Sequence, residues 1–189
     1  MKTVRIPSFL HDVFGERQPL GSITAILLFG GLLTVVLYGM FPEMTDRLPL
    51  WRCIVALLLM FDIFAGCLAN FTASTSNYYA ARRTNRIVFI SIHFHIVAVA
   101  LLLQTSIWQS AAVWAYTIAG TILVNAMIGK PSQPFAAGLL LSVGLGCMPL
   151  LPGLPPYMLI ACSLFMLKVL FSFAVDHYGA AATNRGKKA

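Results

Sequence analysis

The feature that most constrains this chain is a series of apolar stretches, each close to the length at which an α-helix crosses a lipid bilayer. A hydrocarbon core of about 30 Å needs roughly 20 helical residues. The 189-residue sequence contains six such stretches, at residues 23–41, 50–70, 87–104, 108–128, 134–151 and 156–175. They predict an all-α fold, a polytopic membrane bundle of six transmembrane helices.

The composition agrees with this prediction. Hydrophobic residues make up 59% of the chain and charged residues 10%, whereas a soluble domain carries about 25% charged residues. We therefore expect a transmembrane domain over residues 23–176. Residues 1–22 would form a cytoplasmic N-terminal segment, and residues 177–189 a basic cytoplasmic tail.

Lysine and arginine residues predict the orientation. If the N-terminus is inside, only Arg47 and Arg52 lie on the outer side, and Lys168 lies within a helix. The other ten of the 13 lie inside: Lys2, Arg5, Arg17, Arg82, Arg83, Arg86, Lys130, Arg185, Lys187 and Lys188. Cytoplasmic loops carry such an excess. We expect both termini in the cytoplasm and a bacterial-type inner (plasma) membrane as the location.

The net charge of +7 is explained by this topology and by contact with anionic lipid headgroups. No nucleic-acid-binding motif is present, so membrane lipids are the expected partners. A chain this short would also suit a homo-oligomer or a larger membrane complex.

The N-terminal segment has no continuous apolar core, so it is not a cleavable signal peptide. After Pro7, the residues Phe9, Leu10, Val13 and Phe14 follow helical spacing. This pattern fits a short interfacial helix on the inner face. A partly ordered tail fits it equally well.

The four cysteines, Cys53, Cys67, Cys147 and Cys162, form no CxxC or Cys/His spacing. That spacing would signal zinc or a redox pair. A disulfide between Cys53 and Cys147 is conceivable, but four buried thiols are the favoured interpretation. We expect no metal and no cofactor.

Two opposite charges lie inside different apolar stretches. Helical rise of about 1.5 Å per residue places Asp62 and Lys168 each about 18 Å from the outer face. The same rise places His95 about 12 Å from the inner face, at the same level. Ionisable groups at membrane depth are costly and usually mark a site or a specific pair.

Two interpretations remain open. Asp62 and Lys168 could form an ion pair that only fixes helix packing. Alternatively, they belong to a polar cleft open to the cytoplasm, which we favour by a narrow margin. A stripe of residues at helical spacing leads from mid-membrane to the cytoplasmic surface. Asn125 and His93 could line the same cleft. The stripe consists of Asp62, Gly66, Asn70, Ala73 and Asn77.

His93 and His95 are two residues apart, so in a continuous helix they would point to widely separated sides. One site could then not use both comfortably, and haem or metal ligation prefers i, i+3 or i, i+4 spacing. A hydrogen bond between helices is the more common use of such a histidine.

The segment after the second apolar stretch is polar without Pro or Gly, which suggests that this helix extends beyond the membrane. Its aromatic and basic residues could hold a phosphate or lipid headgroup; they are Tyr78, Tyr79, Arg82, Arg83 and Arg86. Anchoring alone would explain them as well.

No Walker loop, GxSxG or HExxH motif is present. The leading hypothesis is proton- or ion-linked transport of a small solute, with Asp62 as the protonatable group. One alternative is an inner-leaflet enzyme that modifies or binds lipid, with His93 or His95 as general base. Another is a non-catalytic subunit or assembly factor.

Overall fold

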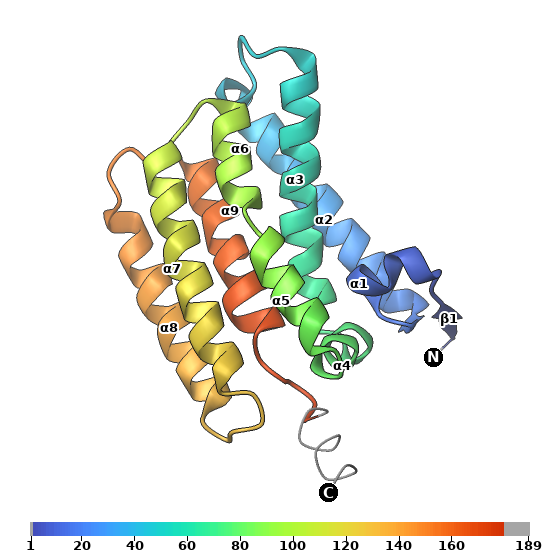
Figure 1. Ribbon diagram of the computed structural model, residues 1–189. Coiled ribbons are helices and arrows are strands. Elements are labelled where there is room, and N and C mark those ends of the chain that lie inside the picture. The colour runs from blue at the N-terminus through green and yellow to red at the C-terminus, as the bar shows by residue number, and fades with distance from the viewer. Residues whose placement is uncertain (1, 180–189) are drawn as a thin grey trace, which may run out of the picture.

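The computed structural model describes residues 2–179, and this part of the chain is mostly helical (Figure 1). Six spans are long and apolar enough to cross a membrane, and they are Leu20–Met40, Leu50–Ala69, Arg83–Leu103, Ile107–Ala126, Gln133–Leu150 and Pro156–Phe173. The expected multi-pass helical bundle is thus supported by length and composition. The third span begins four residues earlier than the sequence predicted, at Arg83 instead of Ile87.

Three of these spans are each made of two helical pieces. The continuous ones are α2 (Leu20–Met40), α3 (Leu50–Ala69) and α7 (Ile107–Ala126). The composite ones are α5 (Arg83–Ile92) with α6 (His95–Leu103), α8 (Gln133–Cys147) with η3 (Met148–Leu150), and α9 (Pro156–Met166) with η4 (Leu167–Phe173), which is a π-helix.

Proline sets several helix starts. Pro19 and Pro49 directly precede α2 and α3, Pro134 is the second residue of α8, and Pro156 is the first residue of α9. At the start of a helix the missing N–H of proline costs nothing, because that donor would have no helical partner. Most of the long helices therefore begin where the sequence places a proline.

The packing is uneven across the bundle. The span α9–η4 is the most buried, and α3 packs against it and against α2 and α6. Helix α2 is the least buried and rests mainly on α3 (Figure 1). The two approach closely at Gly30, where an added Cβ would lie 2.8 Å from the Cβ of Ala65. Small residues allow such close approach between membrane helices.

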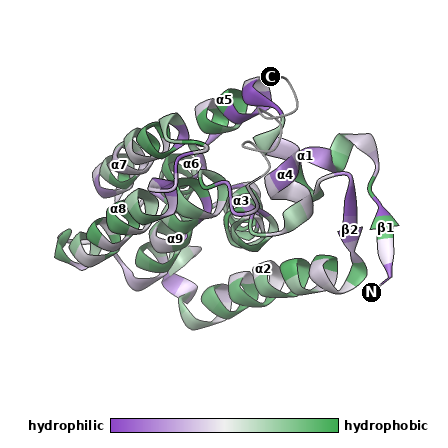
Figure 2. Cartoon of the chain, turned by 90° about the horizontal axis from the view of Figure 1, so that it is seen from below, coloured by the Kyte–Doolittle hydropathy of each residue, from purple (hydrophilic) through white to green (hydrophobic). Residues whose placement is uncertain are grey.

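The long helices expose apolar surface, and polar residues gather at one end. Figure 2 shows mostly green or pale colour along the long helices and purple around α4 (Ala73–Ala80) and β2 (Arg17–Pro19). The exposed residues of α2 include Leu27, Leu28, Leu32, Val35 and Val36. A soluble protein rarely exposes so continuous an apolar face. We refer to the end of the bundle that carries α4 as the α4 end.

Two local features differ from the expectations. Helix α3 does not extend into the polar segment; it ends at Ala69, and α4 is a separate helix. The break follows from Thr72, whose hydroxyl donates to the carbonyl of Ala69 and accepts from the N–H of Thr75. A threonine in this position caps a new helix and so ends the old one.

The N-terminal segment is ordered and not purely helical. Strand β1 (Thr3–Arg5) pairs antiparallel with β2, and between them lie η1 (Ser8–Leu10) and α1 (His11–Phe14). The short helix after Pro7 is therefore present. The small hairpin was not expected, because three-residue strands carry almost no sequence signal. The four cysteines are free thiols, but Cys147 is exposed, so the expectation of four buried thiols is wrong at that position. Most of the expected basic tail lies outside the described residues.

Candidate functional site

The two buried charges are in contact. The Nζ of Lys168 in η4 lies 2.7 Å from the Oδ2 of Asp62 in α3 and 3.2 Å from the backbone carbonyl oxygen of Asp62. The Lys168 side chain is only 4% exposed, whereas that of Asp62 is 46% exposed. The ammonium group is thus deep in the bundle, and the carboxylate lies at the edge of an opening.

Gly66 makes room for this pair. It lies one helical turn after Asp62, and a Cβ there would be 2.5 Å from the Cε of Lys168 and 2.7 Å from its Nζ. A Cβ at this position would force the end of the Lys168 side chain to shift. The glycine in the small and polar stripe therefore has a specific steric role.

His95 is the third member of the cluster. It is the first residue of α6, and its Nδ1 lies 3.8 Å from the Oδ2 of Asp62. This distance is too long for a hydrogen bond, so the imidazole and the carboxylate are neighbours without a direct hydrogen bond. The shared depth predicted for Asp62, Lys168 and His95 thus corresponds to real proximity.

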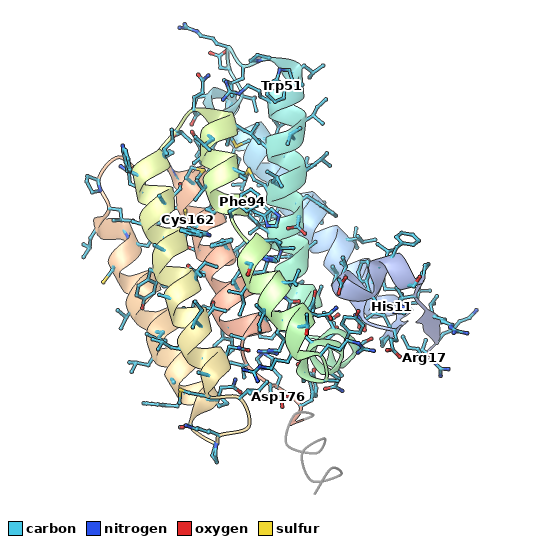
Figure 3. The ribbon with its side chains drawn as sticks, viewed as in Figure 1. His11, Arg17, Trp51, Phe94, Cys162 and Asp176 are labelled. Carbon is cyan, nitrogen blue, oxygen red and sulfur yellow. The ribbon has the colours of Figure 1, made fainter. Side chains whose placement is uncertain are left out.

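The expectation that His93 and His95 point apart is wrong, because the helix is broken between them. Residues 93 and 94 separate α5 from α6, and the two imidazole rings lie 5.0 Å apart between centroids. Figure 3 shows Phe94 at this junction, about midway between Trp51 at one end of the bundle and Asp176 at the α4 end.

The break frees backbone groups that must find partners. The carbonyl oxygen of His93 accepts a hydrogen bond of 2.9 Å from the indole Nε1 of Trp114 in α7. Non-helical backbone at membrane depth is tolerated where protein or a cavity satisfies it. Here Trp114 supplies the hydrogen bond that the carbonyl oxygen of His93 needs.

His93 is held in a defined orientation. Its ring stacks on Phe89 at 3.7 Å, and its Nδ1 contacts the carbonyl oxygen of the same residue. Its Nε2 is buried and finds no hydrogen-bond partner within residues 2–179. The Nδ2 of Asn70 and the Nδ1 of His95 are in the same situation. A buried polar atom without a partner usually faces water or a ligand.

The residues that carry these atoms, Asn70, His93 and His95, line one cavity of about 160 Å³. Its polar lining consists of Asp12, Asp62, Asn70, Tyr79, His93, His95 and Lys168. At about 30 Å³ per molecule, it has room for about five waters or for a small solute. Of the predicted residues, the structure brings Asp62, Asn70, Tyr79, His93, His95 and Lys168 to this cavity.

The N-terminal segment covers the cavity at the α4 end. Asp12 and Val13 of α1 line it, and their carbonyl oxygens accept hydrogen bonds from Tyr79 (2.8 Å) and Thr75 (3.2 Å) of α4. Burial, followed by the nearby charge of Asp12, raises the pKa of Tyr79, so its hydroxyl stays a donor. Sequence reasoning did not connect Asp12 and Val13 to the site, because no short-range pattern does so.

The other six predicted residues do not line the cavity; they are Asn77, Tyr78, Arg82, Arg83, Arg86 and Asn125. Asn77 borders a separate surface depression with Arg82, which pairs with Glu16 at 2.8 Å. The Oδ1 of Asn125 accepts a hydrogen bond of 2.7 Å from Arg86, whose side chain also donates to the carbonyl of Ala174.

The aromatic and basic segment is thus divided. Arg86 is buried and ties three elements together, whereas Arg83 is exposed. Arg82 lies over the ring of Tyr78 at 4.0 Å. Only Arg82 and Arg83, among the three arginines, reach the surface at the α4 end.

Within residues 2–179, no three His, Cys, Asp or Glu side chains converge closely enough to hold a metal ion. Comparisons with protein families, with curated proteins and with solved structures give no match to this chain. The fold and the cavity therefore define its class only as a candidate multi-pass membrane protein with an ionisable site among its helices.

Proposed function

We propose that this protein carries out proton-linked transport of a small solute across a bacterial-type inner membrane, through the cavity beside Asp62. The observation that supports this most is the contact of Asp62 with Lys168 at 2.7 Å and its proximity to His95 at 3.8 Å, beside an interrupted helix. Ionisable residues inside membrane spans are typical of ion and proton pathways.

The interrupted helix adds to the argument. Discontinuous helices surround the substrate sites of many secondary transporters, because helix ends offer unpaired backbone groups at mid-membrane. Here α5 ends and α6 begins beside the cavity, with His95 as the first residue of α6. A hinge at residues 93 and 94 would let the two pieces move separately.

Coupling to protons follows from charge balance. The cluster of Asp62, Lys168, His93 and His95 contains one carboxylate, one ammonium and two imidazoles, and Asp12 adds a second carboxylate to the cavity lining. A solute that changes the net charge there leaves an uncompensated buried charge, which costs several kcal/mol unless a proton moves. Asp62 is the protonatable group of this proposal, and His95 is its neighbour for proton exchange.

The positive-inside rule predicts which end of the bundle would face the cytoplasm. Most lysines and arginines of residues 2–179 belong to segments at the α4 end, so this end would face the cytoplasm. Anionic lipid headgroups would then lie within reach of the exposed Arg83. The N-terminal cover would sit on the cytoplasmic side of the cavity.

The test is solute-driven proton movement in liposomes that contain the purified protein and entrapped pyranine. The panel consists of solutes that do not cross lipid unaided: Na⁺, K⁺, quaternary ammonium ions and zwitterionic amino acids. At least one should change the internal pH in wild-type vesicles and not in empty vesicles. If none does so in either direction of the pH gradient, the proposal fails.

A lipid-modifying enzyme is a second candidate, favoured by one observation. Ile92 lines the cavity and is exposed, and Phe94 next to the site is exposed as well. An apolar rim beside charged groups suits a molecule with a polar head and an acyl tail. In that case His93→Gln and His95→Gln would stop turnover of an added phospholipid, whereas a transporter would leave the lipid unchanged.

A further inference from the structure

The charged residues that line the cavity are mostly acidic, although the chain as a whole is basic. The protein has a net charge of +7 and only six acidic residues. Two of these six, Asp12 and Asp62, line this one cavity, and Lys168 is the only lysine or arginine in its lining. With neutral histidines the lining is net negative, which favours a cation over an anion.

His93 adds an acceptor of hydrogen bonds. Its Nδ1 contacts the carbonyl oxygen of Phe89, and a carbonyl can only accept, so the ring hydrogen lies on Nδ1. The neutral ring then presents a lone pair at Nε2. This atom belongs to a side chain that is 3% exposed, and it has no partner within residues 2–179. It is suited to an N–H donor on a bound molecule.

Asp62 offers a second acceptor beside it. Lys168 engages Oδ2 and the backbone carbonyl, whereas Oδ1 receives no hydrogen bond from residues 2–179. The lysine shows that an ammonium group fits against this carboxylate. A ligand ammonium could use Oδ1 of Asp62 and Nε2 of His93 from the cavity side.

The remaining lining is apolar and the space is small. Val13, Ala69 and Ile92 contribute hydrocarbon surface to the volume of about 160 Å³. Asn70 does not select the charge of a ligand, because its amide can present either a donor or an acceptor. The cavity thus suits a molecule with one cationic, N–H-bearing group and a short apolar tail.

We propose that the cavity binds a small primary ammonium compound. In the transport proposal, on which this inference rests for its biological meaning, such a compound is the solute. The ammonium is held between Asp62 and His93, and the tail lies against Ile92 and Val13. Binding does not require transport, so the two proposals can fail separately.

The test is isothermal titration calorimetry of the detergent-solubilised wild-type protein at neutral pH. Three probes of similar size differ in charge: propylammonium, 1-propanol and acetate. Propylammonium should bind about tenfold more tightly than either of the others. Equal binding of all three, tighter binding of acetate, or no binding of propylammonium would overturn the inference.

A competition experiment with sodium chloride tests whether the site selects ammonium, because a carboxylate alone would attract any cation. Na⁺ should not compete with propylammonium at equal concentration, since it has no N–H to donate to His93. Competition at equal concentration would show a general cation site and overturn the ammonium assignment.

A matched pair of histidine variants tests the residue assignment. His93→Phe keeps a ring to stack on Phe89 and removes Nε2, so propylammonium affinity should fall about tenfold. His177→Phe removes a histidine that does not line the cavity and should leave affinity unchanged. If His93→Phe does not fold, Asp62→Asn replaces it with the same expectation. Unchanged affinity in a folded variant contradicts the assignment.

These outcomes remain distinct from those of the transport test. Propylammonium binding without proton movement in any vesicle experiment would refute transport and leave the ammonium site standing. Proton movement driven by a solute of the panel, in a protein that does not bind propylammonium, would do the reverse.

Discussion

The Nζ of Lys168 lies 2.7 Å from the Oδ2 of Asp62, but the two side chains are buried to very different degrees, with 4% and 46% of their surfaces exposed. The ammonium depends on this carboxylate for compensation, because it has little access to solvent. The carboxylate has other neighbours, including His95, and an opening beside it. The ammonium of Lys168 therefore depends on this ion pair more than the carboxylate of Asp62 does.

The inequality predicts an asymmetric mutant cycle. Asp62→Ala strands a buried ammonium and should destabilise by about 3–5 kcal/mol. Lys168→Met strands a half-exposed carboxylate and should cost about 1–2 kcal/mol, because partial exposure reduces the penalty. The double variant should recover much of the larger loss. Thermal or denaturant unfolding in detergent measures all three; equal effects of the two single changes would contradict the geometry.

Gly66→Ala tests the passage of the lysine stem across α3. The new Cβ would meet the end of a flexible side chain, so the ammonium should shift and the backbone should stay. We expect a loss of about 1–2 kcal/mol, from weakening the ion pair. Gly31→Ala is the matched control, since a Cβ there meets nothing within 4 Å; it should be neutral or stabilise by up to about 1 kcal/mol. Equal effects on the unfolding midpoint would argue against the steric role of Gly66.

Trp114→Phe tests the break between α5 and α6. It removes the donor to the His93 carbonyl and leaves a buried acceptor without its partner, which should destabilise by about 1–3 kcal/mol. Trp108→Phe changes the same residue type at a position that is 84% exposed and should change stability by less than about 0.5 kcal/mol. If the two variants unfold alike, Trp114 does not support the break.

The break between α5 and α6 illustrates which structural features could be predicted from the sequence and which could not. Hydropathy predicted the six spans, and helical rise predicted that Asp62, Lys168 and His95 share one depth. Rise along a helix carries no information about rotation, so the contact itself could not be predicted. The interruption at His93 has no proline or glycine to announce it, and its cause lies in tertiary contacts such as Trp114.

The position of the N-terminal segment over the cavity could not be predicted from the sequence either. Asp12 and Val13 are about 50 residues from Asp62 in the sequence, and only the folded α1 brings them together through Tyr79 and Thr75. The burial of Arg86 was missed for a related reason. An arginine in a basic cluster looks like a surface residue, and its partners Asn125 and Ala174 come from distant elements.

His177 provides a pH-dependent prediction outside the spans. Burial lowers the pKa of His177 below its ordinary value of 6.5, partly offset by its contact with the carbonyl of Ser172. The unfolded chain therefore takes up this proton at a higher pH than the folded protein, and stability falls as the pH drops below 6.5. In unfolding measurements, His177→Gln should flatten the decline between about pH 7 and pH 5. An unchanged slope would exclude His177 as a contributor.

The central claim is that Asp62 serves proton-linked transport and not packing alone. Asp62→Asn retains an oxygen that can accept from Lys168, so the fold should persist while the protonatable group is lost. Asp46→Asn removes a carboxylate that is 72% exposed in the loop before α3.

The most direct measurement compares solute-driven proton movement, reported by entrapped pyranine, in liposomes of these two variants and the wild type. We expect wild-type rates for Asp46→Asn and a loss of about 100-fold or more for Asp62→Asn, in line with removal of an essential acid–base group. Proton movement in folded Asp62→Asn at the wild-type rate would contradict the claim and leave the pair with Lys168 as a structural contact.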